Sequence, residues 1–181
     1  MSDPYAKIIL TNYLQEKEFQ MGLDMYLRAS EYVSRNDWSR DENGDILDTP
    51  NKSFNAIVEA FEMENIIDKT GFAGISIDFP MGYWRKANQI HNWFVENLAD
   101  GVDDCNPILV SREDLETLKE LCIQVLANKE LAEDLLPTGS GFFFGSTTYD
   151  QYYYSDLNDT IGIITKCLES KFDYFEYQAS W

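Results

Sequence analysis

Apolar side chains recur at helical spacing between residues 83 and 98. At 100° of rotation per residue they fall on one arc of a helix, and most charged and amide side chains fall on the other. The single histidine, His91, lies in the middle of the apolar arc, whereas Trp93 stands alone among polar neighbours. We therefore predict an amphipathic helix with His91 buried and Trp93 exposed. The apolar arc comprises Trp84, Ala87, His91, Phe94, Val95 and Leu98.

A second helix is predicted over 110–130, where the start signal is strong. Ser111 is a good N-cap, and Asp114 takes the position that glutamate usually holds in a capping box. Leucines recur on one face of this segment, which predicts a buried stripe. Further helices are predicted over 4–19, 53–66 and 149–171.

Four segments have the composition of strands, namely 23–33, 74–79 (ending at Pro80), 142–144 and 172–181. The polar segment 34–52 is expected to be a loop. Strands and helices do not alternate in a regular βαβ rhythm, which favours the α+β class. We expect a small, mostly antiparallel sheet packed with three to four amphipathic helices. Residues 21–181 are expected to form this single domain, and residues 1–20 a helical N-terminal extension.

The composition suits one domain with a substantial core. The chain has 181 residues, of which 44% are hydrophobic and 14% aromatic. No apolar run is long enough to cross a bilayer, and the N-terminus lacks a secretory signal pattern. Three widely spaced cysteines without a CxxC pair are typical of free thiols in a reducing compartment. We therefore expect a cytoplasmic protein that does not associate with membranes.

Charge is the most unusual property of the sequence. The net charge is −18, from 32 acidic and 14 basic residues. The segment from Ala87 to Thr165 holds 14 of the acids but three bases, a balance of −11. Such a field repels nucleic acid, anionic lipid and phosphorylated ligands, and it attracts basic surfaces or cations. The charge predicts a basic partner; a solvated face that maintains solubility is the other interpretation.

No common active-site motif is complete. The segment GSGFFFGST (139–147) lacks the lysine and the spacing of a P-loop, and its glycines are typical of turns. The segment DENGDILD (41–48) is similar to a calcium loop, but its glycine comes too early and Lys52 replaces the bidentate glutamate. The three aspartates within 100–104 are more typical of a solvated turn than of a weak cation site.

His91 decides whether the chain has the chemistry of an enzyme. It could be a general base, a metal ligand or a packed core residue. A zinc site would need His91 together with distant cysteines that show no paired spacing, and no nucleophile motif accompanies it. A histidine centred on a buried stripe is usually structural. We therefore predict no catalytic residue, no metal and no cofactor.

Aromatic rings framed by acids are a stronger signal than any catalytic motif. Tyrosines and aspartates cluster at the start of the 149–171 helix, and acids crowd the turn before the 110–130 helix. Such rings stack on arginine, whose guanidinium also pairs with carboxylates. These features predict a surface that binds a basic protein. The candidate partner-binding residues are Trp93, Asp100, Asp103, Asp104, Glu113, Asp114, Glu116, Asp150, Tyr152, Tyr154 and Asp156.

Five blocks of the sequence resemble a widespread family of small phage and prophage proteins. The blocks are MGLDMYL (21–27), YWRKANQIHNWF (83–94), DGVDDC (100–105), VSREDL (110–115) and LLPTGSGFFFGSTTYD (135–150). Members usually begin at MGLDMYL, so the resemblance implies nothing for residues 1–20. It also transfers no functional residue.

The chain is also similar to anti-CRISPR proteins of this phage pool, which inhibit the RNA-guided nuclease of type II-A systems. This resemblance implies a stoichiometric inhibitor in a bacterial cytoplasm, without a cofactor. An acidic inhibitor can occupy a channel lined with lysine and arginine that normally receives nucleic acid. Two alternatives stay open. One is a protein, or an enzyme, that binds a nucleotide-like small molecule in a pocket around Trp84 and His91. The other is an acidic assembly factor.

Overall fold

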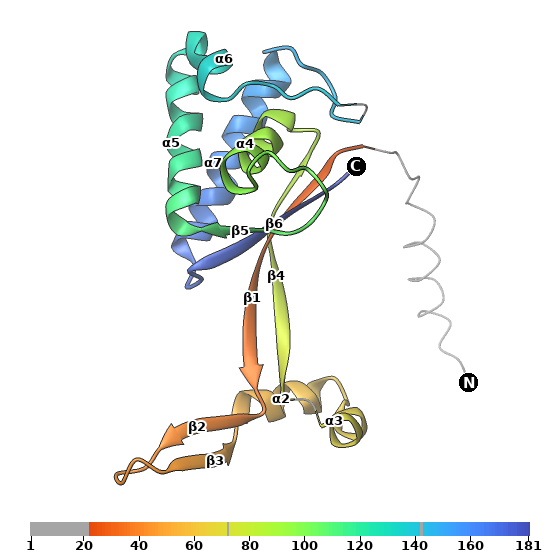
Figure 1. Ribbon diagram of the computed structural model, residues 1–181, viewed down its shortest axis with the longest axis vertical. Helices are drawn as coiled ribbons and strands as arrows, with labels where there is room; N and C mark the ends of the chain where they lie inside the picture. The colour runs from red at the N-terminus through yellow and green to blue at the C-terminus, as the bar shows by residue number, and fades with distance from the viewer. Residues whose placement is uncertain (1–21, 72, 142) are drawn as a thin grey trace, which may run out of the picture.

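The computed structural model describes residues 22–181 except residues 72 and 142. It shows a body of sheet and helices from which a long two-stranded arm projects, with a small second module at its tip (Figure 1). The helix predicted over 4–19 lies outside the described residues. No helix among the described residues is long and apolar enough to span a membrane.

A four-stranded sheet forms the framework of the body. Its order is β4-β1-β6-β5, and every neighbouring pair is antiparallel. The α+β class and the antiparallel sheet are therefore confirmed. The strands are β1 (Asp24–Ser34), β4 (Gly74–Arg85), β5 (Ile108–Ser111) and β6 (Tyr174–Ser180).

Helices cover the body part of this sheet. They are α4 (Asn88–Leu98), α5 (Arg112–Ala127), α6 (Ala132–Leu135) and α7 (Gln151–Glu169), with a short 3₁₀ turn at Lys129–Leu131. In β1 the side chains of Met25, Leu27 and Ala29 alternate into the core, as the sequence pattern predicts. Among the described residues this core contains 23 buried hydrophobic ones, most of them on the sheet and helices, so the body carries most of the buried apolar surface.

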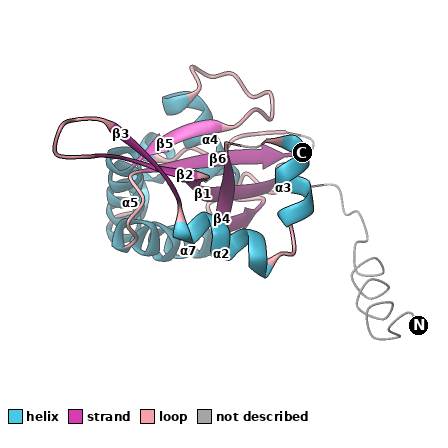
Figure 2. Cartoon of the chain, turned by 90° about the horizontal axis from the view of Figure 1, so that it is seen from below, coloured by secondary structure: helices cyan, strands magenta, loops and turns pink. Residues whose placement is uncertain are grey.

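The arm exists because β1 and β4 continue beyond the rest of the sheet. Strand β6 pairs with β1 over Asp24–Arg28, whereas β4 pairs with β1 along its whole length to Ser34. At the end of the arm a β-hairpin and two helices leave in different directions (Figure 1, Figure 2). A small separate core there contains Phe54, Val58 and Ile67. The tip elements are β2 (Asn36–Arg40), β3 (Ile46–Pro50), α2 (Lys52–Ala60) and α3 (Glu64–Thr70).

The loop predicted over 34–52 is wrong, because the segment forms the β2–β3 hairpin and its turn. The Asp41 carboxylate accepts the N–H groups of Asn43 and Asp45, and Gly44 adopts a positive φ of 87°. An Asn-Gly pair is a strong hairpin signal, but the residues on either side of it are mostly polar and lack the alternating pattern that predicts strands. The helix predicted over 53–66 is divided into α2 and α3.

Two other predicted boundaries and one predicted strand are wrong. Strand β4 passes through Pro80, which an edge strand tolerates because no neighbour needs its missing N–H. This extension leaves α4 to begin at Asn88 instead of residue 83. The predicted strand over 142–144 is absent from the described residues of that segment, since Phe143 and Phe144 form a turn. The short strand β5 was not predicted at all.

Helices α5 and α7 begin where local chemistry predicts. Ser111 and Asp114 form a complete capping box at the start of α5. The Asp150 carboxylate caps α7 by accepting the N–H groups of Tyr152 and Tyr153. Both starts place acidic side chains at helix N-termini, where the helix dipole stabilises them.

Candidate functional site

His91 lies in a closed polar network in the body. Its side chain is within the core, with the residue 2% exposed, so the predicted burial is confirmed. The Nδ1 atom lies 2.8 Å from the Tyr177 hydroxyl, and Nε2 lies 3.0 Å from Oδ2 of Asp103. The other carboxylate oxygen of Asp103 accepts the indole N–H of Trp181 at 3.1 Å. Both ring nitrogens and both carboxylate oxygens therefore have partners.

Burial of Tyr177 determines how protons are arranged in this network. Burial raises the pKa of Tyr177 well above its ordinary value, and the nearby charge of Asp103 adds to the effect. Tyr177 thus keeps its proton, and its hydroxyl donates a hydrogen bond to Nδ1 of His91 in the imidazole tautomer that carries its hydrogen on Nε2. The Nε2–H of His91 then donates to Asp103, which is the usual way in which a partner selects the imidazole tautomer.

Aromatic rings leave no room for a ligand beside His91. The Phe144 ring meets the imidazole edge-on, with centroids 5.1 Å apart, and Phe94 stacks on Tyr177 at 3.9 Å. The remaining cavity measures about 10 Å³, which is about the space of one water molecule. Trp84 is also buried, and its indole N–H donates to the Thr160 hydroxyl at 2.9 Å. The geometry at His91 and Trp84 is that of a packed core.

Asn88, at the start of α4, holds the glycine-rich loop over this core. Its side-chain amide donates to the carbonyls of Phe144 and Ser146 at 3.0 and 2.8 Å. Its carbonyl oxygen accepts the N–H of Gly139 at 3.1 Å. One buried side chain therefore holds this glycine-rich loop in place. The glycines are accounted for by the turns of the loop, and no phosphate-binding role is needed to explain them.

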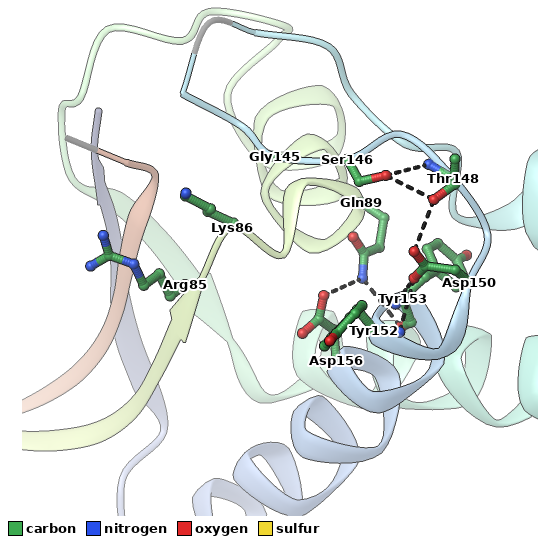
Figure 3. A pocket seen from close by; sticks show the side chains of 10 residues that line it. All are labelled: Arg85, Lys86, Gln89, Gly145, Ser146, Thr148, Asp150, Tyr152, Tyr153 and Asp156. Atoms are coloured by element: carbon green, nitrogen blue, oxygen red, sulfur yellow. Dashed lines mark hydrogen bonds between the residues drawn. The ribbon is translucent and has the colours of Figure 1, made fainter. Parts of the chain in front are cut away.

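An open pocket of about 310 Å³ lies between the starts of α4 and α7. Figure 3 shows that its side chains come from the end of β4, the first turn of α4, the glycine-rich loop and the first turns of α7. Gln89 forms part of its wall and is 2% exposed. The pocket is lined by Arg85, Lys86, Gln89, Gly145, Ser146, Thr148, Asp150, Tyr152, Tyr153 and Asp156.

The two carboxylates of this pocket differ in their surroundings. The pKa of Asp156 is raised to about 6, chiefly by burial; the hydrogen bond from Gln89 opposes this shift, and the charges of Asp159 and Asp150 add to it. The hydrogen bond from the Thr148 hydroxyl and the N–H of Tyr153 lower the pKa of Asp150. Asp150 is therefore a stable anion, whereas ionisation of Asp156 is disfavoured by its surroundings.

The acids predicted at the turn and at the start of α5 are dispersed among structural roles. Asp103 bonds His91 and Trp181, Asp104 accepts two hydrogen bonds from Asn106, and Asp114 completes the capping box. The remaining acids of that group are exposed to solvent, namely Asp100, Glu113 and Glu116.

The predicted residues at the start of α7 lie close together, unlike the acids of the turn and of α5. Asp150, Tyr152 and Asp156 line the open pocket. Tyr154 lies on an adjacent surface hollow, where the Lys129 ammonium is 4.3 Å from its ring centroid.

Trp93 is the one candidate that the structure excludes from the surface. The prediction that it is exposed is wrong, since it is 7% exposed and packs edge-on against Phe94 at 5.3 Å. The reason lies in α4 as a whole, because seven of its eleven residues are buried. Helix α4 is enclosed on more than one side, so an amphipathic pattern underestimates its contacts.

The residue that sequence analysis missed is Gln89. The helical pattern assigns Gln89 to the solvent face, and no sequence motif distinguishes it. Its amide nitrogen donates to Oδ2 of Asp156 at 3.2 Å and approaches the Tyr153 carbonyl at 3.5 Å. Two residues far apart in the sequence thus form one wall of the pocket.

The cysteines and acids give no metal centre within the described part of the chain. No group of three or more His, Cys, Asp or Glu side chains is close enough there to hold a metal ion. All three cysteines are free. Burial raises the pKa of Cys122 to about 12 and that of Cys167 to about 11, so both thiols stay protonated.

No family model, no curated protein and no solved structure matches this chain.

Proposed function

We propose that this protein is a stoichiometric inhibitor that binds a basic protein surface. The partner we propose is a type II CRISPR nuclease or its guide complex in a bacterial cytoplasm, whose DNA binding or cleavage is blocked. The observation that carries the proposal is the surface at the start of α7. There Asp150 and Asp156 flank Tyr152, which is 81% exposed.

Charge and aromatic surface support different stages of such binding. The net charge of −18 would steer the protein toward a lysine- and arginine-rich channel and accelerate encounter. Exposed rings such as Tyr152 would then hold the complex, because tyrosine is enriched at the centres of interfaces. The same negative field opposes direct binding of DNA or RNA.

The geometry of His91 argues against catalysis and so favours a binding function for the protein. Both ring nitrogens are engaged, and the adjacent cavity has space for about one water molecule. A general base needs an accessible nitrogen within hydrogen-bond reach of a substrate. The same crowding argues against the alternative of a small-molecule pocket centred on His91 and Trp84.

DNA cleavage by purified nuclease and guide RNA, titrated with this protein, tests the proposal. We expect cleavage to stop near one equivalent, with a complex that elutes as one species in size-exclusion chromatography. Association should slow steeply as added salt shortens the Debye length from about 10 Å at 0.1 M to about 3 Å at 1 M. Full cleavage at large excess, together with no complex, would overturn the proposal.

A charge-reversed variant gives the matched control. Replacing Asp100, Glu113 and Glu116 by lysine changes exposed side chains and leaves the pocket intact. We expect slower association with nearly unchanged dissociation, because distant charges act on encounter. Equal association rates for the wild type and the variant would show that these charges do not steer the encounter.

A further inference from the structure

We propose that the pocket between α4 and α7 binds the guanidinium group of an arginine side chain presented by a protein partner. This inference rests on the proposed function for the source of the arginine. The chemistry of the pocket itself is independent of it.

Gln89 directs an unused hydrogen-bond acceptor into the pocket. Its Nε2 atom faces a carboxylate oxygen of Asp156 and the Tyr153 carbonyl, both of which accept hydrogen bonds, so the orientation of the amide is fixed. No donor among the described residues reaches its Oε1 atom. In Figure 3 this oxygen points into the space between α4 and the end of β4. No buried side-chain atom of the described residues lacks a partner, so this oxygen is open to solvent, and a ligand that donates hydrogen bonds can replace the water there.

Asp156 adds a negative charge without a counter-charge. No cationic group of the described residues lies within ion-pair distance of its carboxylate, whereas Arg85 pairs with Asp24 at 3.1 Å. Figure 3 shows the side chains of Arg85 and Lys86 directed away from Asp156. Burying a charge without a partner is costly, so a guest cation would stabilise the site.

The shape of the pocket favours guanidinium over other cations. Acceptors approach from two sides, with Oε1 of Gln89 on α4 and the carboxylates of Asp156 and Asp150 on α7. A planar fork of five N–H donors can satisfy such acceptors together, whereas an ammonium acts as a point charge. Tyr152 at the rim offers a ring face on which guanidinium stacks.

Size and charge suit an arginine side chain. A volume of about 310 Å³ is at the lower limit of small-molecule pockets and accommodates one extended side chain. Arg85 and Lys86 also line the pocket, but their side chains point away from Asp156 (Figure 3), so the charges closest to Gln89 are carboxylates. An arginine from a partner would reach the pocket from the open side, with Tyr152 as the first contact.

NMR titration of the full-length protein with N-acetyl-arginine amide tests the inference directly. We expect saturable shifts of the Gln89 side-chain amide and of Tyr152, with N-acetyl-lysine amide binding more weakly. N-acetyl-citrulline amide is the neutral isostere and should not bind. Equal shifts from the citrulline compound, or no saturable shift from the arginine compound, would overturn the inference.

Matched variants assign the binding to the pocket. Asp156→Asn keeps the hydrogen-bond acceptor for Gln89 but removes the charge, so affinity for the arginine probe should fall about tenfold. Asp159→Asn removes the same charge from α7 outside the pocket and should change affinity by less than about twofold. Equal losses in the two variants would reduce the effect to general electrostatics and refute a defined site.

The outcomes separate this inference from the proposed function. Binding of the probe without inhibition of the nuclease would keep the pocket and reject that partner. Inhibition that Asp156→Asn leaves unchanged would keep the inhibitor and reject the pocket. Free arginine or agmatine binding much more tightly than the blocked probe would identify a small-molecule site and overturn the assignment to a protein partner.

Discussion

Two polar side chains on α4, Gln89 and His91, are both 2% exposed, but their surroundings are opposite in kind. Two residues correspond to 200° of helical rotation, so they face nearly opposite sides. Around His91 each polar atom has a partner, and aromatic rings seal the site. Around Gln89 one acceptor and one carboxylate face an open pocket.

This difference teaches that chemical identity does not locate a functional site. Histidine is the more versatile group, but its neighbours complete its hydrogen bonds and restrict it to stabilising the core. Glutamine is unreactive, but its open oxygen makes it a recognition element. The open Oε1 atom of Gln89 and the unpaired charge of Asp156 are the reasons for proposing that this side of α4 binds arginine.

The largest effect is expected on the closed side. His91→Ala leaves the Asp103 carboxylate and the Tyr177 hydroxyl without their shared partner, so the free energy of unfolding should fall by about 2–3 kcal/mol. Urea unfolding followed by circular dichroism measures the loss. Glu96→Ala, at an exposed position of the same helix, is the control and should have little effect. A variant that is fully stable but unable to bind would reverse the roles assigned to the two sides.

Binding on the open side should depend on pH. Asp156 must be ionised to attract a cation, and its pKa of about 6 implies affinity that is high above pH 7 and falls through pH 6. Affinity for N-acetyl-arginine amide should be about tenfold lower at pH 5 than at pH 8. Besides Gln89, the titratable groups that line the two hollows around Asp156 are Tyr83, Arg85, Lys86, Asp150, Tyr152, Tyr153, Asp159 and Lys166, of which Arg85 and Lys86 point away from it (Figure 3). An unchanged affinity at pH 5 would exclude Asp156 as the anion.

The charge of Asp156 should also cost stability. The folded-state pKa of Asp156 lies above its unfolded value of 3.8, so folding favours the protonated form. Its contribution to stability is therefore complete below pH 4 and is lost as the pH rises through 6. Asp156→Asn should gain on the order of 1 kcal/mol at pH 7.5, after allowance for solvent screening, and nothing at pH 4. Thermal melts at the two pH values measure this, and a loss at pH 7.5 would contradict it.

The smallest effect is expected at the rim. Tyr152 is 81% exposed, so Tyr152→Ala should leave the melting temperature nearly unchanged. Loss of the stacking face should weaken binding of the arginine probe by about 0.5–1 kcal/mol. Tyr32→Ala provides the control, since that ring is also exposed but lies on the arm. Equal affinities for the two variants would show that the rim takes no part.

Much of the fold could be predicted because its signals are local. The capping box of Ser111 and Asp114 is made within four residues, and the alternation in β1 follows from strand geometry alone. The burial of His91 followed from its place on the apolar arc. Long-range context instead decided that β4 continues through Pro80, because the sequence does not show that β4 is an edge strand.

The candidate site was predicted in part. Asp150, Tyr152 and Asp156 could be proposed because exposed tyrosines among acids have a plain chemical meaning, and one helix brings them together. The acids of the turn carry the same composition, but Asp103 and Asp114 are used structurally. Composition does not distinguish a free carboxylate from one with a partner.

The sequence by itself determined the class of the fold, the starts of α5 and α7, and the buried place of His91. Each of these depends on interactions within a few residues or on periodicity along one element. Only the tertiary structure decided that Gln89 and Trp93 are buried and that the Gln89 amide donates to Asp156 across a gap of 67 positions. The reason is that burial of a polar or solitary residue depends on what packs over it, and Gln89 is covered by α7, which comes more than 60 positions later in the chain.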